Sequence, residues 1–129
     1  MLEPTGGSVL IADDDSLVRM VLRMGIENLG HQAVSVGTFE ELGTALSEQA
    51  FALCIMDVSM PCSSLEDRLD QTSRLAPEMP VMVLSGYSEA PETVREQGLR
   101  FLSKPISLDE LGVALAGFGM GFAGGAETA

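Results

Sequence analysis

Short runs of apolar residues alternate along this chain with longer segments of helical periodicity, and this alternation restricts the possible fold more than any other feature. Apolar runs of this length without polar alternation are typical of parallel strands that are buried on both faces. Helical segments between such strands cover the two faces of one sheet. We therefore predict an α/β fold, a doubly wound parallel sheet whose strands lie near residues 9–12, 33–36, 51–57, 81–84 and 99–103.

Polar residues stand at the ends of four of these runs. Asp13 and Asp14 follow the first run, Asp57 ends the third, Ser85 follows the fourth and Lys104, the only lysine of the chain, follows the last. The carboxyl ends of parallel strands lie at one edge of the sheet, where open α/β sheets bind their ligands. These five side chains should therefore converge on one pocket.

The chemical types in this pocket point to phosphoryl transfer. Three carboxylates repel one another at neutral pH, and Mg²⁺, which prefers oxygen ligands, relieves that repulsion. The ammonium of Lys104 suits an anion, and Ser85 supplies a small hydroxyl donor. Together these groups indicate transfer of a phosphoryl group onto a carboxylate, and Asp57 is the expected acceptor.

Composition narrows the class of protein. At 129 residues and 46% hydrophobic, the chain is long enough for one domain with one core. A net charge of −12 disfavours attraction to nucleic acid or to an anionic membrane. No run approaches the ~20 apolar residues of a membrane span, and the start at residues 1–4 lacks a signal-peptide pattern. We expect a cytoplasmic protein with neither nucleic acid nor membrane as a partner, and with Cys54 and Cys62 as free thiols.

The helical segments carry start and stop signals. Thr38 with Glu41, and Ser107 with Glu110, have capping-box spacing. Further signals predict helix starts at 15–16, near 64 and at Ser88 with Pro91, and helix ends at Gly30 and Gly98. Three of the predicted inner faces are Val18, Val21, Leu22, Gly25 and Leu29 in the first helix, Leu65, Leu69 and Leu75 in the third, and Leu108, Leu111, Leu115 and Phe118 in the last.

Domain organisation follows from these elements. Residues 8–118 are expected to form the domain, with residues 1–7 as an N-terminal extension. Residues 119–129, which are rich in glycine, are expected to form a flexible tail. The lone His31 follows Gly30 and is interpreted as a residue of a helix exit or a strand edge, not as a phosphocarrier.

Four motifs in order carry a resemblance to a known family. They are Val9-Leu10-Ile11-Ala12-Asp13-Asp14-Asp15-Ser16, Ile55-Met56-Asp57-Val58-Ser59-Met60-Pro61, Val83-Leu84-Ser85-Gly86-Tyr87 and Phe101-Leu102-Ser103-Lys104-Pro105. On these motifs the chain resembles, over about residues 8–118, the receiver domain of the two-component response regulators. The resemblance implies a flavodoxin-like sheet of five strands in the order 2-1-3-4-5.

The same resemblance implies a role for each site residue. Asp57 would accept the phosphoryl group of a phosphohistidine, while Asp14, Asp57 and the carbonyl of Ser59 bind Mg²⁺ and Asp13 assists through water. Ser85 and Lys104 would hold the phosphoryl oxygens. Ser85 and Phe101 would form the switch, and Lys104-Pro105 would be a cis peptide.

The resemblance also implies partners. The phosphoryl donor would be a sensor histidine kinase or a histidine phosphotransfer protein. The output would be a downstream protein or a second copy, bound through the helix after Ser88, the strand 99–103 and the helix after Ser107. Such a domain is no enzyme in the ordinary sense, although it assists its own phosphorylation and dephosphorylation. The segment 85–89 resembles that of hybrid-kinase receivers, and the sequence leaves open whether the domain stands alone or belongs to such a kinase.

One departure from the family pattern keeps alternatives open. Ser64 and Leu65 stand where the family usually has an Asp-Gly pair, so the following helix is expected to start late or to be displaced. One alternative is a degenerate receiver that acts only as a binding scaffold. Another is a haloacid-dehalogenase-like phosphatase, in which residues 13–16 supply an Asp-x-Asp nucleophile and acid, but this leaves Asp57 without a role.

Overall fold

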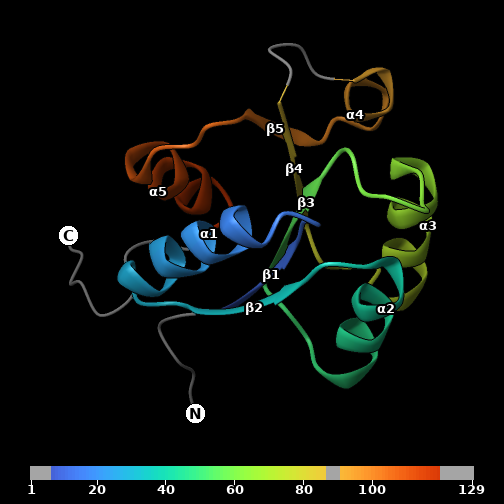
Figure 1. Cartoon of the computed structure of the whole chain (residues 1–129), viewed down its shortest axis with the longest axis horizontal. Helices are drawn as coiled ribbons and strands as arrows, with labels where there is room; N and C mark the ends of the chain where they lie inside the picture. Colours follow the sequence, from blue (N-terminus) through green and yellow to red (C-terminus); the bar gives the residue numbers. More distant parts are fainter. Residues whose placement is uncertain (1–6, 87–90, 120–129) are drawn as a thin grey trace.

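The computed structural model of the chain describes residues 7–86 and 91–119 (Figure 1). The predicted extension and tail therefore lie outside the described residues except for Gly7 and Gly119, and so does the predicted helix start at Ser88. In the described part of the chain, no helix combines the length and the apolar character that crossing a membrane requires.

The sheet confirms the predicted topology. Five parallel strands are ordered β2-β1-β3-β4-β5, and their bounds are Ser8–Ala12 (β1), Gln32–Val36 (β2), Leu53–Asp57 (β3), Val81–Ser85 (β4) and Arg100–Ser103 (β5). The register places Ala12 opposite Met56, and Asp57 opposite Leu84. The carboxyl ends of the two central strands, β1 and β3, are therefore neighbours, as the fold class requires.

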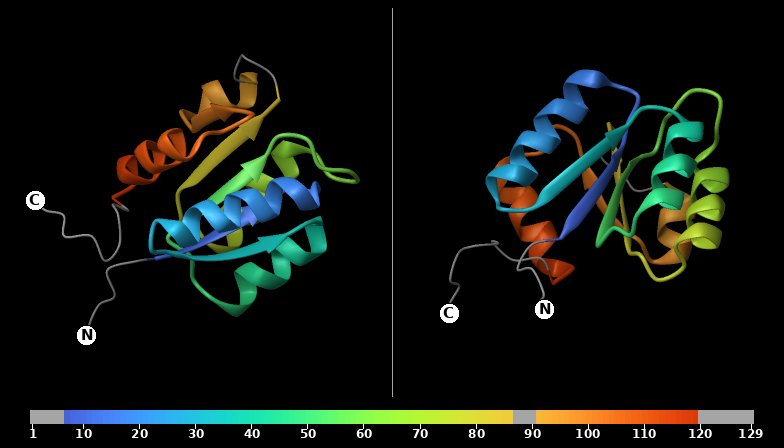
Figure 2. Two further views of the ribbon diagram at one scale, coloured as in Figure 1. Left: turned by 60° about the vertical axis from the view of Figure 1, so that its left-hand side comes forward. Right: turned by 90° about the horizontal axis from the view of Figure 1, so that it is seen from below.

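Helices cover both faces of the sheet (Figure 2). Their bounds are Ser16–Asn28 (α1), Phe39–Glu48 (α2), Leu65–Leu75 (α3), Glu92–Gln97 (α4) and Leu108–Gly117 (α5). On one face, Leu22 and Ile26 of α1 and Leu115 of α5 pack in one apolar cluster with alternate residues of the strands. On the other face, Leu42 of α2 and Leu69 of α3 belong to a second cluster. The sheet thus separates two cores, because successive strand residues point to opposite faces.

Capping residues begin most of these helices where the sequence predicts. Asp15 accepts the N–H groups of Leu17 and Val18, and Thr38 accepts the N–H of Glu41. Ser107 and Glu110 form the full reciprocal capping box of α5. In α2 the Glu41 carboxylate instead accepts the N–H of Gly37 at 2.7 Å, one residue earlier than the box predicts.

The connection before α3 differs from the expectation of a late or displaced helix. Ser64 caps the helix by accepting the N–H of Asp67 at 3.0 Å, so α3 begins at Leu65 despite the missing glycine. Cys62 takes the left-handed conformation, with φ of 63°. This is an uncommon conformation for a residue other than glycine, and here it lets the chain turn tightly after Pro61.

Three residues assigned to inner helix faces are exposed to solvent. Val21 is 51% exposed, Leu75 is 45% exposed and Leu108 is 54% exposed. In α3 the buried positions include instead Arg68 and Thr72, both polar. The helical period correctly predicts which face of each helix is apolar. How much of that face is buried depends on the elements that pack against it in the tertiary structure.

Candidate functional site

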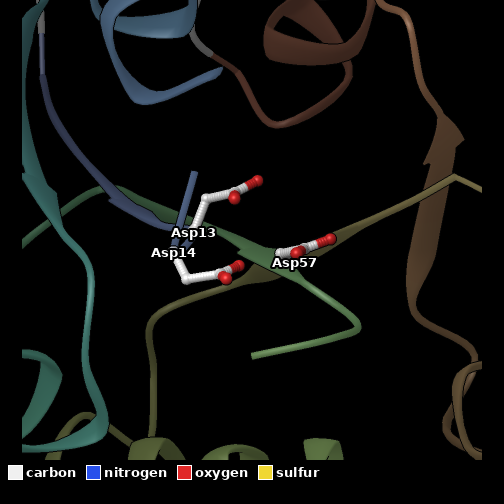
Figure 3. Close-up of side chains that lie close together, drawn as sticks. All are labelled: Asp13, Asp14 and Asp57. Atoms are coloured by element: carbon white, nitrogen blue, oxygen red, sulfur yellow. The ribbon is translucent and has the colours of Figure 1, made fainter. Parts of the chain in front are cut away.

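Three carboxylates meet at the carboxyl edge of the sheet (Figure 3). Asp13 and Asp14 follow β1, and Asp57 is the last residue of β3, with one oxygen of each lying within 4.8 Å of the others. Asp13 is fully buried and Asp57 is 5% exposed, whereas Asp14 is exposed to solvent. The prediction that these acids converge is confirmed.

Lys104 joins the two buried acids. Its Nζ lies 3.0 Å from Oδ2 of Asp13 and 3.1 Å from Oδ1 of Asp57. The residue directly follows β5, and its N–H donates to the carbonyl of Ser85 at 2.7 Å, which ties the two strand ends together. The Lys104-Pro105 peptide is cis, as expected. One ammonium therefore bridges the carboxylates that would otherwise repel most strongly.

Further hydrogen bonds fix the position of Asp13. Its Oδ1 accepts the N–H of Asp15 at 2.9 Å, and its main-chain carbonyl accepts an N–H of the Arg19 guanidinium at 2.7 Å. The carboxylate therefore has one oxygen held by the backbone and one held by Lys104. A group fixed from both sides is preorganised to act on a neighbour.

The electrostatics of the site set Asp57 apart. Burial raises the pKa of Asp57 above its ordinary value, the charges of Asp13 and Asp14 raise it further, and Lys104 opposes these effects. Burial lowers the pKa of Lys104, but its hydrogen bonds and charge interactions with Asp57 and Asp13 outweigh burial, so that this pKa lies above its ordinary value. The neighbours of Lys104 thus favour its charged form, whereas burial and the other two acids disfavour the charged form of Asp57.

The donor set fits a hard divalent cation. Only carboxylate oxygens meet in the cluster, and the exposed Asp14 leaves it accessible from solvent. Burial is the main cause of the raised pKa of Asp57, and a cation with oxygen preference would offset the further contribution from the charges of Asp13 and Asp14. Ser59 lies two residues beyond Asp57 in the exposed connection to α3.

Ser85 and Phe101 lie where the switch pair is expected along the chain. Ser85 ends β4 and is 1% exposed. Phe101 lies in β5 opposite Val83 and is half-buried against the core that α2 and α3 cover. His31, in contrast, is buried, and its Nδ1 accepts the N–H of Gly7 at 3.1 Å, in agreement with its interpretation as a strand-edge residue.

Arg68 is a site neighbour that the sequence analysis missed. It is fully buried in α3, and its Nη2 donates to the carbonyls of Asp57 and Val58, both at 2.7 Å. An arginine in a helix usually indicates an exposed face. The signal that could have found it is its spacing of three residues after Leu65 and four before Thr72, on the buried stripe of α3.

Comparisons with known proteins agree with this geometry. The family model described as the response regulator receiver domain matches residues 9–116. The chain is 33% identical over 108 residues to the DNA-binding transcriptional regulator NtrC of Bradyrhizobium sp., covering 81% of this chain and 22% of NtrC. It is 34% identical over 106 residues to the sensory/regulatory protein RpfC of Xanthomonas campestris, covering 76% of this chain and 14% of RpfC.

Solved structures share the fold. A receiver domain from Methylobacillus flagellatus superposes with a TM-score of 0.75 at 21% identity, covering 88% of this chain and 98% of that one. The chain thus spans nearly the full length of this solved receiver domain, but less than a quarter of the two curated relatives.

Proposed function

Because the chain belongs to the response regulator receiver domain family, we propose that Asp57 accepts a phosphoryl group from a phosphohistidine. The observation that carries the proposal is the position of this carboxylate. It is buried at the end of β3, beside the carboxylates of Asp13 and Asp14 and 3.1 Å from Lys104. The family match also leaves the phosphatase alternative without support, since that reading has no use for Asp57.

The proposed step transfers phosphorus from nitrogen to oxygen. A carboxylate oxygen of Asp57 attacks phosphorus and forms the O–P bond of an acyl phosphate. The N–P bond of the phosphohistidine breaks, and its electron pair returns to the imidazole nitrogen of the donor. Lys104, already paired with Oδ1 of Asp57, would move its charge to a phosphoryl oxygen as the carboxylate loses its own charge. The buried hydroxyl of Ser85 would donate to another phosphoryl oxygen.

Mg²⁺ is the proposed cofactor, held by Asp14, Asp57 and the carbonyl of Ser59, with Asp13 assisting through water. When bound, it would neutralise charge on the phosphoryl oxygens during transfer. The fixed position of Asp13, with Oδ1 held by the N–H of Asp15, would keep a water in place without competing for the phosphoryl group.

The partners belong to the same proposal. The donor would be a sensor histidine kinase or a histidine phosphotransfer protein, acting in the cytoplasm. The phosphorylated domain would signal through a downstream protein or a second copy bound at α4, β5 and α5, and would assist hydrolysis of its own acyl phosphate. Residues 8–118 would form this unit, alone or within a longer chain.

Chemical labelling tests the acceptor. Incubation with acetyl phosphate and Mg²⁺, followed by borohydride reduction and peptide mass spectrometry, should modify Asp57 and no other residue. Asp57→Asn should abolish the label. Asp70→Asn should retain it, because Asp70 is exposed on α3, away from the site, and forms an ion pair with Arg74 at 3.0 Å. Label on Asp13 would contradict the proposal, and a folded wild-type protein without any label would favour the degenerate scaffold.

A further inference from the structure

One arginine bridges both ends of the connection between β3 and α3. Besides the two bonds from its Nη2, Arg68 donates from Nη1 to the carbonyl of Ser63 at 3.0 Å and to its Oγ at 2.9 Å. The first pair of bonds reaches the strand end at Asp57 and Val58, and the second reaches the last residue before the cap of α3. The guanidinium is therefore a brace inside a turn of the main chain.

Packing does not explain this buried charge. Arg68 is fully buried, and within residues 7–86 and 91–119 no carboxylate lies within ion-pair distance of it. Removing a cation from water is costly unless other groups replace its hydration. Here main-chain carbonyls and one hydroxyl accept from Nη1 and Nη2, while the buried Nε has no partner among the described residues. The cost of burial is therefore offset only in part, and the bonds that offset it hold the backbone of residues 57–63.

The bonds act on the backbone that the proposed chemistry uses. They include the carbonyl of Asp57 itself and that of Val58, which precedes Ser59. A metal ligand supplied by the carbonyl of Ser59 must be held within a fraction of an ångström, and this connection also contains the left-handed Cys62. A planar fork with donors in fixed directions suits this task better than a single ammonium.

We propose that Arg68 is a positioning residue, whose four hydrogen bonds fix the main chain of residues 57–63 and thereby set the metal affinity of the site. The effect on metal affinity rests on the proposed function. The effect on the backbone does not, since it is a property of the metal-free protein. The positive charge of Arg68, which interacts with Asp57 and Asp14, opposes the binding of a cation, whereas its hydrogen bonds favour it, so the test has to separate geometry from charge.

Amide hydrogen exchange of the metal-free protein provides the first test. Arg68→Met, which removes the fork and the charge, should accelerate exchange within residues 57–63 by about ten-fold or more, the scale expected for losing hydrogen bonds to a charged group. Arg68→Lys keeps the charge but has one nitrogen, which cannot reach both ends of the connection. It should therefore exchange nearly as fast as Arg68→Met.

Two variants on the same helix serve as controls. Thr72→Val removes a buried hydroxyl that donates to the carbonyl of Arg68 at 2.8 Å, and so perturbs α3 without touching the connection. Arg74→Met removes an exposed arginine. Both should leave exchange of residues 57–63 as in the wild type, even where Thr72→Val lowers the melting temperature.

Calorimetric titration with Mg²⁺ provides the second test. The dissociation constant for Mg²⁺ should increase by about ten-fold in Arg68→Met and Arg68→Lys, and it should stay unchanged in both controls. Should Arg68→Met fail to fold, Arg68→Lys and Ser63→Ala still decide, and Ser63→Ala should show a smaller acceleration because it removes only one of the acceptors.

Wild-type exchange in Arg68→Lys would show that charge alone suffices and would overturn the proposal. Exchange in residues 57–63 that is accelerated as much in Thr72→Val as in Arg68→Met would also overturn it, because Arg68 would then contribute only to the stability of α3. A wild-type protein that binds no Mg²⁺ would contradict the proposed function instead, and the exchange data would still decide on Arg68.

Discussion

At the scale of single residues, the site is a balance between a desolvated carboxylate and its neighbours. Asp57 is buried beside Asp13, and Lys104 offsets only part of the resulting cost, so the pKa of Asp57 remains raised. A carboxyl group whose pKa is higher in the folded than in the unfolded state destabilises the fold above that pKa. The penalty begins to shrink as the pH falls below this raised pKa, and it disappears only below the lower pKa of the unfolded state.

Asp57→Asn should therefore stabilise the metal-free protein at neutral pH. We expect a rise of a few degrees in melting temperature, the scale of about 1 kcal/mol for a domain of this size. The difference from the wild type should shrink as the pH is lowered through the raised pKa of Asp57. Thermal melts with a chelator across this pH range check it. The exposed Asp70→Asn should show no such trend, and a destabilised Asp57→Asn at neutral pH would mean that the ion pair with Lys104 dominates.

At the scale of elements, we propose that β5 transmits a change at the site to the rest of the domain. Its last residue precedes Lys104, and Phe101 lies opposite Val83, two residues before Ser85 in the neighbouring strand. Phe101 has no hydroxyl, so only packing can distinguish an inward from an outward ring. The helix that follows, α5, is fixed at its start by the capping box. Its charged residues, Asp109 and Glu110, are both acidic, so α5 has no basic side chain that could pair with an acid of a partner.

Phe101→Ala should uncouple the signal from phosphorylation. Labelling of Asp57 by acetyl phosphate should change little. Binding of a downstream partner should weaken by roughly 1 to 3 kcal/mol, the usual scale of coupling between sites. Until a partner is identified, the fluoroberyllate-induced change in hydrogen exchange of α4 and β5 is the measurement, and it should be smaller in Phe101→Ala. Phe118→Ala is the control, since Phe118 follows α5 and its ring lies under the guanidinium of Arg100, in the apolar cluster on the face of the sheet opposite to Phe101. A full response in Phe101→Ala would show that the signal does not pass through Phe101, and α4 would then be the next element to test.

At the scale of the whole molecule, charge and stability are linked through the same edge of the sheet. The chain carries a net charge of −12, and three of its acids meet at one point. A cation that binds only the folded state stabilises the whole domain by mass action. The response of the melting temperature to Mg²⁺ therefore reports on the site even without any phosphoryl donor.

Mg²⁺ should raise the melting temperature of the wild type, and Asp14→Asn should remove most of that rise. Asp15→Asn should keep it, because Asp15 lies on the same loop but caps α1. Asparagine caps a helix about as well as aspartate, so Asp15→Asn should also change the starting melting temperature little. An equal rise in melting temperature in wild type and Asp14→Asn, together with equal Mg²⁺ affinity in calorimetry, would refute the assignment of Asp14 as a metal ligand.

The sequence alone determined the fold class and the location of the site. Apolar runs interrupted by helical periods leave few topologies, and strand ends meet at one edge in all of them, so Asp13, Asp14, Asp57 and Lys104 had to be neighbours. Caps such as Ser107 are local interactions, which is why their positions could be predicted as well.

Only the tertiary structure decided which side chains are buried and what they hold. Val21 and Leu108 have the sequence spacing of an inner helix face, but no other element covers them fully, and about half of each residue is exposed. Arg68 resembles a surface residue of a helix, yet the turn between β3 and α3 leaves main-chain carbonyls pointing at its position. Burial and the partners of a polar group depend on residues distant in sequence, and periodicity carries no information about them.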